Sequence, residues 1–210
     1  MTPAAPAPSA PWPAIFLAWA LLALALGFFL PPPDLTRVGR LLLIPGPALI
    51  LIALYGTRPG LRAFAERLGG RRLSALHGLR LPIGVLFLGL AERGLLPWEF
   101  ATPAGVGDIV AGGLMLLVFF GWRRGRAFAA FALLANVFGF LDLANVLRTV
   151  DVLGSADRAG EFRAFEGSPL GVVPYFLVPI LLATHVILFR AHLAVLRGET
   201  PGLLVRPEGR

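Results

Sequence analysis

The sequence predicts an all-α, polytopic membrane helix bundle with six transmembrane helices and both termini in the cytoplasm. Hydrophobic residues make up 57% of the chain and charged residues 15%, a more apolar and less charged composition than that of an ordinary soluble domain. The apolar residues gather in long runs that suit bilayer-spanning helices. Arginines cluster between these runs, and they are abundant in one loop and scarce in the next.

Prolines bound or bend the first two predicted spans. Residues 14–30 contain no charged side chain and are followed by three consecutive prolines, which cannot continue a helix. Residues 38–55 form a second, mainly apolar run that carries Pro45 and Pro47. We expect this span to kink where the two prolines remove backbone hydrogen-bond donors.

The third span needs polar residues to cross the membrane. Its charge-free core, residues 81–91, would rise only about 16 Å as a helix, roughly half the hydrocarbon thickness. It must therefore recruit the flanking residues 74–80 and 92–97. Either these polar flanks extend to the two interfaces, or they face a protein interior.

The second half of the chain predicts three more spans. Residues 96–108 contain two prolines and two glycines and predict a structured outer loop. Spans are expected at residues 105–122, 127–147 and 170–189. Within the acidic linker at residues 149–168, the segment 161–166 could form a short amphipathic helix in the outer interface, although its acidic share argues against strong attraction to lipid.

Arginine distribution sets the predicted orientation. The loops after spans two and four and the C-terminal tail are basic, whereas the loops after spans three and five are neutral or acidic. The positive-inside rule then places both termini in the cytoplasm. We expect a disordered leader at residues 1–13, one bundle at residues 14–192 and a cytoplasmic tail at residues 193–210.

Composition also excludes several functions. The chain has no cysteine, which removes disulfides, thiolate metal sites and cysteine nucleophiles. All 19 basic side chains are arginine, so lysine Schiff-base chemistry is excluded. The net charge of +7 reflects topology rather than nucleic-acid binding, because the arginines flank apolar runs. No G-x-S-x-G motif supports a serine hydrolase, and whether the protein is an enzyme stays open.

Polar residues in and near the spans are the candidate ligand- or ion-binding residues, most of them close to the predicted outer face. They are Glu92, Asp108, Asn136, Asp142, Asn145 and Arg148. Asp142 and Asn145 are three residues apart and share a helix face. A carboxylate within a span should face the bundle and have a partner, which Arg148 or Arg93 could be. Two interpretations stand: an outward-facing polar cavity that binds a cation, a proton or a small ligand, or a structural network in which Asp108 caps a helix.

Histidines form a second candidate group, expected near the inner face. His77 begins span three, with Arg80 one turn later, and His185 lies in span six. Two histidines on facing helices could hold haem b or relay protons; alternatively, each bonds a carbonyl group or lies at the interface. His192 follows on the face of His185 but lies among arginines and is not expected to be a ligand. No His/Glu pair has metal-ligand spacing, so no metal site is predicted.

Parts of spans three to six resemble an uncharacterised group of bacterial multi-pass membrane proteins. The resemblance rests on His77-x-x-Arg80, on the segment from Leu96-Pro97 to Gly107-Asp108, and on the helix with Asn136, Asp142 and Asn145. This group brings no established activity. It adds weight to Asp108, Asp142, His77 and Arg80.

These observations predict an inner-membrane protein that transports a small solute, an ion or a proton, or that binds a ligand. The alternatives are a haem-containing redox protein and a non-catalytic accessory subunit of a membrane complex. Its expected partners are the lipid bilayer and, through small-residue helix faces such as Gly112-Gly113, other membrane subunits or further copies of itself.

Overall fold

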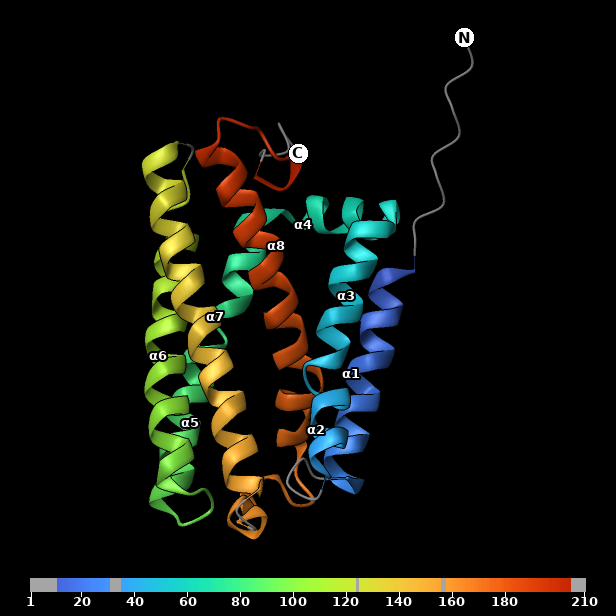
Figure 1. The fold of residues 1–210 in the computed structure, drawn as a ribbon, viewed down its shortest axis with the longest axis vertical. Helices are drawn as coiled ribbons and strands as arrows, with labels where there is room; N and C mark the ends of the chain where they lie inside the picture. The colour runs from blue at the N-terminus through green and yellow to red at the C-terminus, as the bar shows by residue number, and fades with distance from the viewer. Residues whose placement is uncertain (1–10, 31–34, 124, 156–157, 205–210) are drawn as a thin grey trace.

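The computed structural model describes residues 11–30, 35–123, 125–155 and 158–204. Within these ranges the chain is helical, and six helical segments are long and apolar enough to cross a membrane. The all-α, six-span prediction is confirmed at that level. Figure 1 shows the start of α1, the first part of α4 and the end of α8 at one end of the bundle, called the α4 end below.

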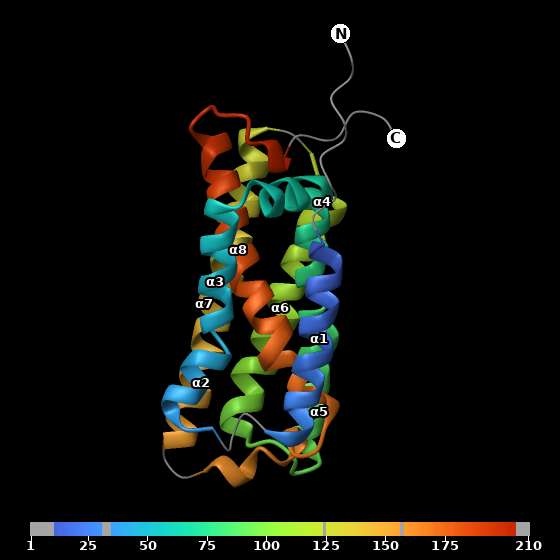
Figure 2. The same cartoon turned by 90° about the vertical axis from the view of Figure 1, so that its right-hand side faces the viewer.

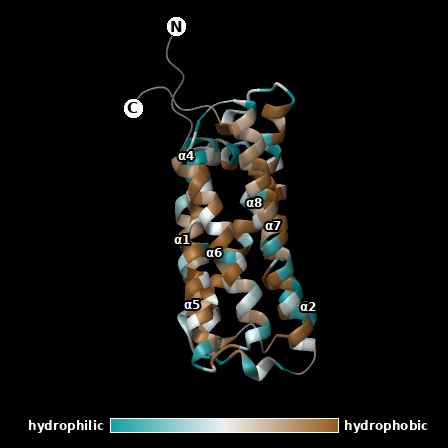
Figure 3. Ribbon diagram, turned by 90° about the vertical axis from the view of Figure 1, so that its left-hand side faces the viewer, coloured by the Kyte–Doolittle hydropathy of each residue, from teal (hydrophilic) through white to brown (hydrophobic). Residues whose placement is uncertain are grey.

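The longer helices follow the chain up and down the bundle. They are α1 (Trp12–Phe29), α2 (Arg37–Leu43), α3 (Gly46–Thr57), α4 (Pro59–His77), α5 (Arg80–Glu92), α6 (Trp98–Phe120), α7 (Arg126–Ser155) and α8 (Val178–Leu196). Short helical turns connect or extend them: η2 (Ala159–Glu161), η3 (Arg163–Phe165), η4 (Pro169–Gly171), η5 (Val173–Leu177) and η6 (Gly202–Leu204). Figure 3 shows hydrophobic residues along the helices, with hydrophilic residues gathered at α4.

The second span breaks where the prolines predicted a kink. Helix α2 ends at Leu43, and α3 begins at Gly46 with Pro47 in its first turn. Proline has no N–H to donate to the preceding turn, so the helix must restart rather than continue.

Helix α4 turns sharply before it enters the bundle. Gly69 has a φ of 75°, a left-handed conformation that favours glycine and breaks the helical path. Figures 1 and 2 show the first part of α4 lying across the end of the bundle and the second part turning along it. The third span therefore begins near Gly70, and it buries Ser74, His77 and Arg80 instead of extending them to an interface.

The segment predicted as an outer loop is helical. Helix α6 begins at Trp98, directly after Pro97, and contains Pro103 in its second turn. Gly105 serves close packing rather than a turn: a Cβ there would lie 2.9 Å from the carbonyl oxygen of Gly84 in α5. The loop prediction for residues 96–108 is wrong because these small residues pack α6 against α5 along this stretch.

The linker after span five closes the end of the bundle opposite α4. Helix α7 extends to Ser155, eight residues beyond the predicted span, and η2 and η3 follow it. Phe162 and Phe165 in this linker are buried, and the ring centroids of Phe162 and Phe100 are 5.1 Å apart. The predicted interfacial amphipathic helix is therefore wrong, because these aromatic side chains face the protein rather than lipid.

A cluster of ion pairs links η2 to the start of α6 at this end of the bundle. Arg158 pairs with Glu161 in η2 and also reaches Glu99 at the start of α6, at 3.0 Å. The hydrogen bond from Arg158 holds the pKa of Glu161 below its usual value.

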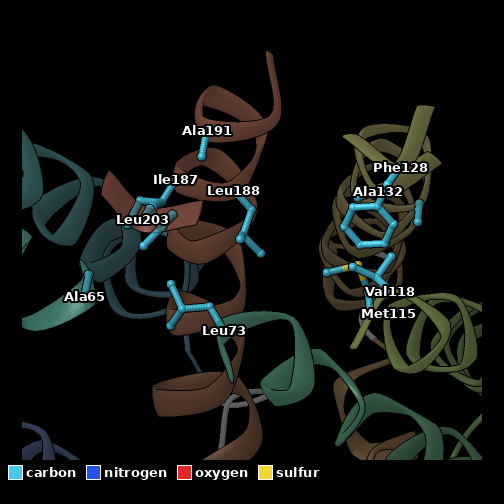
Figure 4. Packing of buried hydrophobic residues seen from close by; sticks show 11 residues of the cluster. Ala65, Leu73, Met115, Val118, Phe128, Ala132, Ile187, Leu188, Ala191 and Leu203 are labelled. Carbon is cyan, nitrogen blue, oxygen red and sulfur yellow. The ribbon is translucent and has the colours of Figure 1, made fainter. Parts of the chain in front are cut away.

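A cluster of hydrophobic side chains lies toward the α4 end of the bundle. Met115, Val118 and Leu188 are fully buried there, within the cluster of side chains drawn in Figure 4. Leu203, from η6 beyond α8, packs into the same cluster. Part of the predicted cytoplasmic tail is therefore packed against the bundle, while residues 205–210, like residues 1–10 of the predicted leader, lie outside the described residues.

The docking of α1 offers a test of this packing. A Cβ at Gly171 would lie 2.0 Å from the Cα of Gly27 in α1, whereas a Cβ at Gly89 in α5 would meet nothing within 4 Å. We expect Gly171→Ala to destabilise the protein by about 1–3 kcal/mol through overpacking against α1. Gly89→Ala should leave stability unchanged or raise it by up to about 1 kcal/mol. Thermal unfolding in mild detergent measures both, and equal midpoints for the two variants would contradict this packing of α1.

Candidate functional site

Arg80 lies between two carboxylates from different helices. Its Nε donates to Oδ1 of Asp108 in α6 at 2.6 Å, and its Nη2 donates to Oδ2 of Asp142 in α7. Its Nη1 donates to the carbonyl oxygen of Gly139 at 2.8 Å. The Arg80 side chain is 1% exposed, and the side chains of Asp108 and Asp142 are 9% and 10% exposed. We call Arg80, Asp108 and Asp142 the Arg80 centre; it joins α5, α6 and α7.

Two glycines make room for the Arg80 centre. A Cβ at Gly107 would lie 1.7 Å from Oδ1 of Asp142, so any other residue would displace this carboxylate. A Cβ at Gly139 would lie 3.2 Å from Nη1 of Arg80 and 2.8 Å from Cε1 of His185. The backbone of α7 can therefore approach both Arg80 and His185 only because residue 139 has no side chain.

A pair of buried histidines adjoins the Arg80 centre. The rings of His77 and His185 have centroids 4.1 Å apart, and the two side chains are 0% and 1% exposed. His185 Nδ1 lies 2.8 Å from Oδ1 of Asn136, whose Nδ2 donates to the carbonyl oxygen of His185 at 2.9 Å. Because the amide oxygen of Asn136 can only accept, Nδ1 of a neutral His185 carries the proton and its Nε2 is a bare acceptor.

His77 has the corresponding arrangement with Thr184. The Thr184 hydroxyl donates to the carbonyl oxygen of Ile180 at 2.8 Å and lies 3.0 Å from His77 Nε2. With its one proton given to the carbonyl, the hydroxyl accepts from Nε2–H of His77, which leaves Nδ1 of a neutral His77 as a bare acceptor. Neither His77 Nδ1 nor His185 Nε2 has a hydrogen-bond partner among the described residues.

The site as a whole holds more proton acceptors than protons. Arg80 carries one positive charge, and each of its three side-chain nitrogens donates one hydrogen bond, to Asp108, Gly139 and Asp142 respectively. With both carboxylates ionised, the Arg80 centre has one net negative charge in an apolar bundle. Such a charge is expensive to bury, and one added proton would neutralise it.

The predicted separation of the candidates into an outer and an inner group is wrong. Asp108 lies near the middle of α6 because this helix begins at Trp98, so it does not cap a helix start. Arg80 lies at the corresponding depth because the third span begins near Gly70. The partner of Asp142 is accordingly Arg80, and neither Arg148 nor Arg93 pairs with it.

Three of the predicted candidates lie away from the centre. Glu92, Asn145 and Arg148 are exposed. The Thr149 hydroxyl, which continues the stripe of Asn145, donates to the Asn145 carbonyl oxygen and so satisfies a helix turn. Asn136 does belong to the site, through His185.

Sequence reasoning missed Gly107, Gly139 and Thr184 as parts of the site. A signal existed for Gly139, because it lies three residues from both Asn136 and Asp142 and shares their helix face. Gly107 gave no comparable signal, since its role depends on which helix packs against it.

A narrow cavity reaches the Arg80 centre from the end opposite α4. It has a volume of about 70 Å³, and its lining includes Asp108 and, farther out, Arg40, Phe162 and Phe165. Most of the lining is hydrophobic, unlike the polar cavity that the sequence predicted. The volume admits a few water molecules beside Asp108 and is far below the several hundred Å³ of a typical small-molecule pocket.

The histidine pair does not fit a haem. Rings whose centroids are 4.1 Å apart are already in van der Waals contact, so no planar macrocycle can lie between them. Among the described residues, no group of three His, Asp or Glu side chains could hold a metal ion. His192 lies apart, with Nδ1 bonded to the Leu188 carbonyl oxygen at 2.8 Å.

Residues 38–193 match the family model described as Domain of unknown function (DUF8737), and the chain belongs to this family. The match covers most of the chain, including every residue of the Arg80 centre and the histidine pair. It confirms the expected membership of an uncharacterised family. Neither a curated protein nor a solved structure matches the chain.

The close approach of α6 and α7 at Gly107 can be tested by substitution, with Gly113 of the same helix as the control. Gly107→Ala should displace the Asp142 carboxylate and destabilise the protein by about 1–3 kcal/mol. Gly113→Ala is the control, because a Cβ there would meet nothing within 4 Å. Thermal midpoints in detergent compare the two; a Gly107→Ala protein as stable as Gly113→Ala would rule out the close approach of Asp142.

The dependence of the two carboxylates on the charge of Arg80 can be tested by substitution. Arg80→Met should destabilise the protein by about 3–5 kcal/mol, because it leaves two buried carboxylates without their cation. Adding Asp108→Asn and Asp142→Asn should recover most of this loss, since neither amide carries a charge. Unfolding midpoints of the single and triple variants decide the matter. A triple variant less stable than Arg80→Met would show that the carboxylates are not a burden once Arg80 is gone.

Proposed function

We propose that this member of the family is a proton-binding transport protein in which the Arg80 centre takes up one proton. The observation that carries the proposal is the buried side chain of Arg80 between Asp108 and Asp142, with two unpaired histidine nitrogens next to it. A buried site with this surplus of acceptors gains stability when it receives a proton.

The charges favour a proton over a metal cation. The guanidinium of Arg80 already occupies the space between the two carboxylates and would repel a second cation. A proton instead converts one carboxylate to a neutral acid, and this acid can still accept a hydrogen bond from Arg80. His185 Nε2 and Arg80 Nη1 both face Gly139, so a proton could pass between the centre and the histidine pair over a short path.

Access to the centre differs between its two sides. The narrow cavity approaches Asp108 from the end opposite α4, whereas the packed side chains of Met115, Val118 and Leu188 lie toward the α4 end. In this conformation a proton would enter from the cavity side. Passage across the protein would then require the hydrophobic layer at the α4 end to open, as alternating access demands.

We place the protein in a bacterial cytoplasmic membrane, with the α4 end on the cytoplasmic side. Helix α4 contains the strongest arginine cluster, and the positive-inside rule assigns that end to the cytoplasm. Both termini are then cytoplasmic, and the cavity opens outward. A small solute whose transport is coupled to the proton is the natural cargo of such a centre.

Infrared spectroscopy of the purified protein tests proton uptake without a known substrate. Lowering the pH should produce a carbonyl-stretch band from a buried protonated carboxyl group in the wild-type protein. The band should be lost in the double variant Asp108→Asn/Asp142→Asn, because no carboxyl group remains in the centre. Glu92→Gln removes an exposed carboxylate and should keep the band.

Each outcome bears on the proposal. A wild-type protein without such a band at any pH at which it stays folded would refute proton binding. A band that persists in the double variant would assign it to another carboxyl group. Reconstitution in liposomes then measures coupling: a pH gradient should collapse at least tenfold more slowly with Asp142→Asn than with Glu92→Gln, about 1.4 kcal/mol in the barrier.

A further inference from the structure

Two hollows meet at the α4 end of the bundle, between α3, α4 and α8. One, of about 310 Å³, is lined almost wholly by hydrophobic side chains, among them Phe16, Leu51 and Phe64. The other, also about 310 Å³, contains the charged residues Arg62, Glu66 and Arg190. Tyr55 and Ile187 line both, so the two hollows are adjacent.

The apolar hollow lies where the bundle is most open to lipid. Its walls include residues of α1, α3, α4 and α8. In the spans that contain α1 and α3, only 11% and 17% of the residues in the most hydrophobic stretch are buried within the protein. Figure 2 shows the first part of α4 crossing this end of the bundle. This part of α4 directs Leu61 and Phe64 into the hollow, while Arg58, Arg62 and Arg67 are exposed, as in an interfacial amphipathic helix.

The charged hollow has a surplus of positive charge. Arg190 is exposed and forms no ion pair within the described part of the chain, and Arg62 donates to the carbonyl oxygen of Gly56 at 2.8 Å. Glu66 offsets one of the two arginines. The remaining guanidinium donors suit phosphate oxygens, which arginine binds with charge-assisted hydrogen bonds.

We propose that this double hollow binds an anionic phospholipid, with an acyl chain in the apolar part and the phosphate-containing headgroup at Arg62 and Arg190. A basic hollow beside an apolar one, under an interfacial helix, matches the two halves of such a lipid. The site contains no residue of the Arg80 centre, although Thr184, which contacts His77, lines its apolar part. The lipid proposal does not depend on the proposed proton binding.

Selectivity must come from the headgroup. The bilayer solvates an acyl chain about as well as a protein groove does, so the chain alone gives little preference for the site. The charge on the headgroup distinguishes phosphatidylglycerol from phosphatidylcholine of identical acyl chains. These two lipids are therefore the probes.

Thermal unfolding of the full-length protein in detergent, titrated with each lipid, measures binding. We expect phosphatidylglycerol to bind the wild-type protein at least about fivefold more tightly than phosphatidylcholine. This preference should disappear in Arg62→Gln/Arg190→Gln and persist in Arg72→Gln, an exposed arginine of α4 that lines neither hollow. Glycerol phosphate, a headgroup without chains, should give no shift.

Three results would overturn the proposal: equal binding of the two lipids by the wild-type protein, an unchanged preference in the double variant, or an equal shift with glycerol phosphate. Leu51→Trp provides a second variant that alters no charge. It narrows the apolar hollow from α3, and we expect it to abolish stabilisation by phosphatidylglycerol while the protein remains folded. Undiminished stabilisation of Leu51→Trp would place the lipid elsewhere.

Discussion

The structure depends on one buried charge and its neutralisation. Arg80 carries a positive charge, and an unpaired guanidinium in the middle of an apolar bundle would cost several kcal/mol. Asp108 and Asp142 compensate it from α6 and α7, so three helices have a fixed register at one point. Close packing of α5 and α6 and the glycines beside the centre follow from this requirement, because the short aspartate side chains reach Arg80 only if the backbones approach closely.

The two ionised carboxylates carry more negative charge than the guanidinium of Arg80 neutralises, so the centre has one net negative charge. Two carboxylates exceed one guanidinium, and His77 and His185 add bare nitrogens without adding charge. A purely structural ion pair needs one carboxylate. In the proposed proton-binding site, the second carboxylate and the histidine pair supply the additional proton acceptors, and the narrow cavity at Asp108 supplies the approach.

The two ends of the bundle have different surroundings. At the end opposite α4, Phe162 and Phe165 close over the helices beside the cavity. At the α4 end, an arginine-bearing helix lies across the bundle above an apolar hollow. The proposed proton site and the proposed lipid site are neighbours, because Thr184, which contacts His77, also lines the apolar hollow.

The sequence by itself determined the helical class, the six spans and the break at Pro45, because apolar run length and proline act locally along the chain. It also identified the residues of the Arg80 centre and the histidine pair as candidates, since charged and polar groups within spans are rare. Only the tertiary structure decided that they meet. Their depth depends on where helices begin. Pro97, Pro103 and Gly105 resemble a loop in the sequence, yet Pro103 and Gly105 lie within α6, and α5 packs against Gly105. Contacts such as that of Gly107 with Asp142 arise between distant segments, so no local pattern in the sequence encodes them.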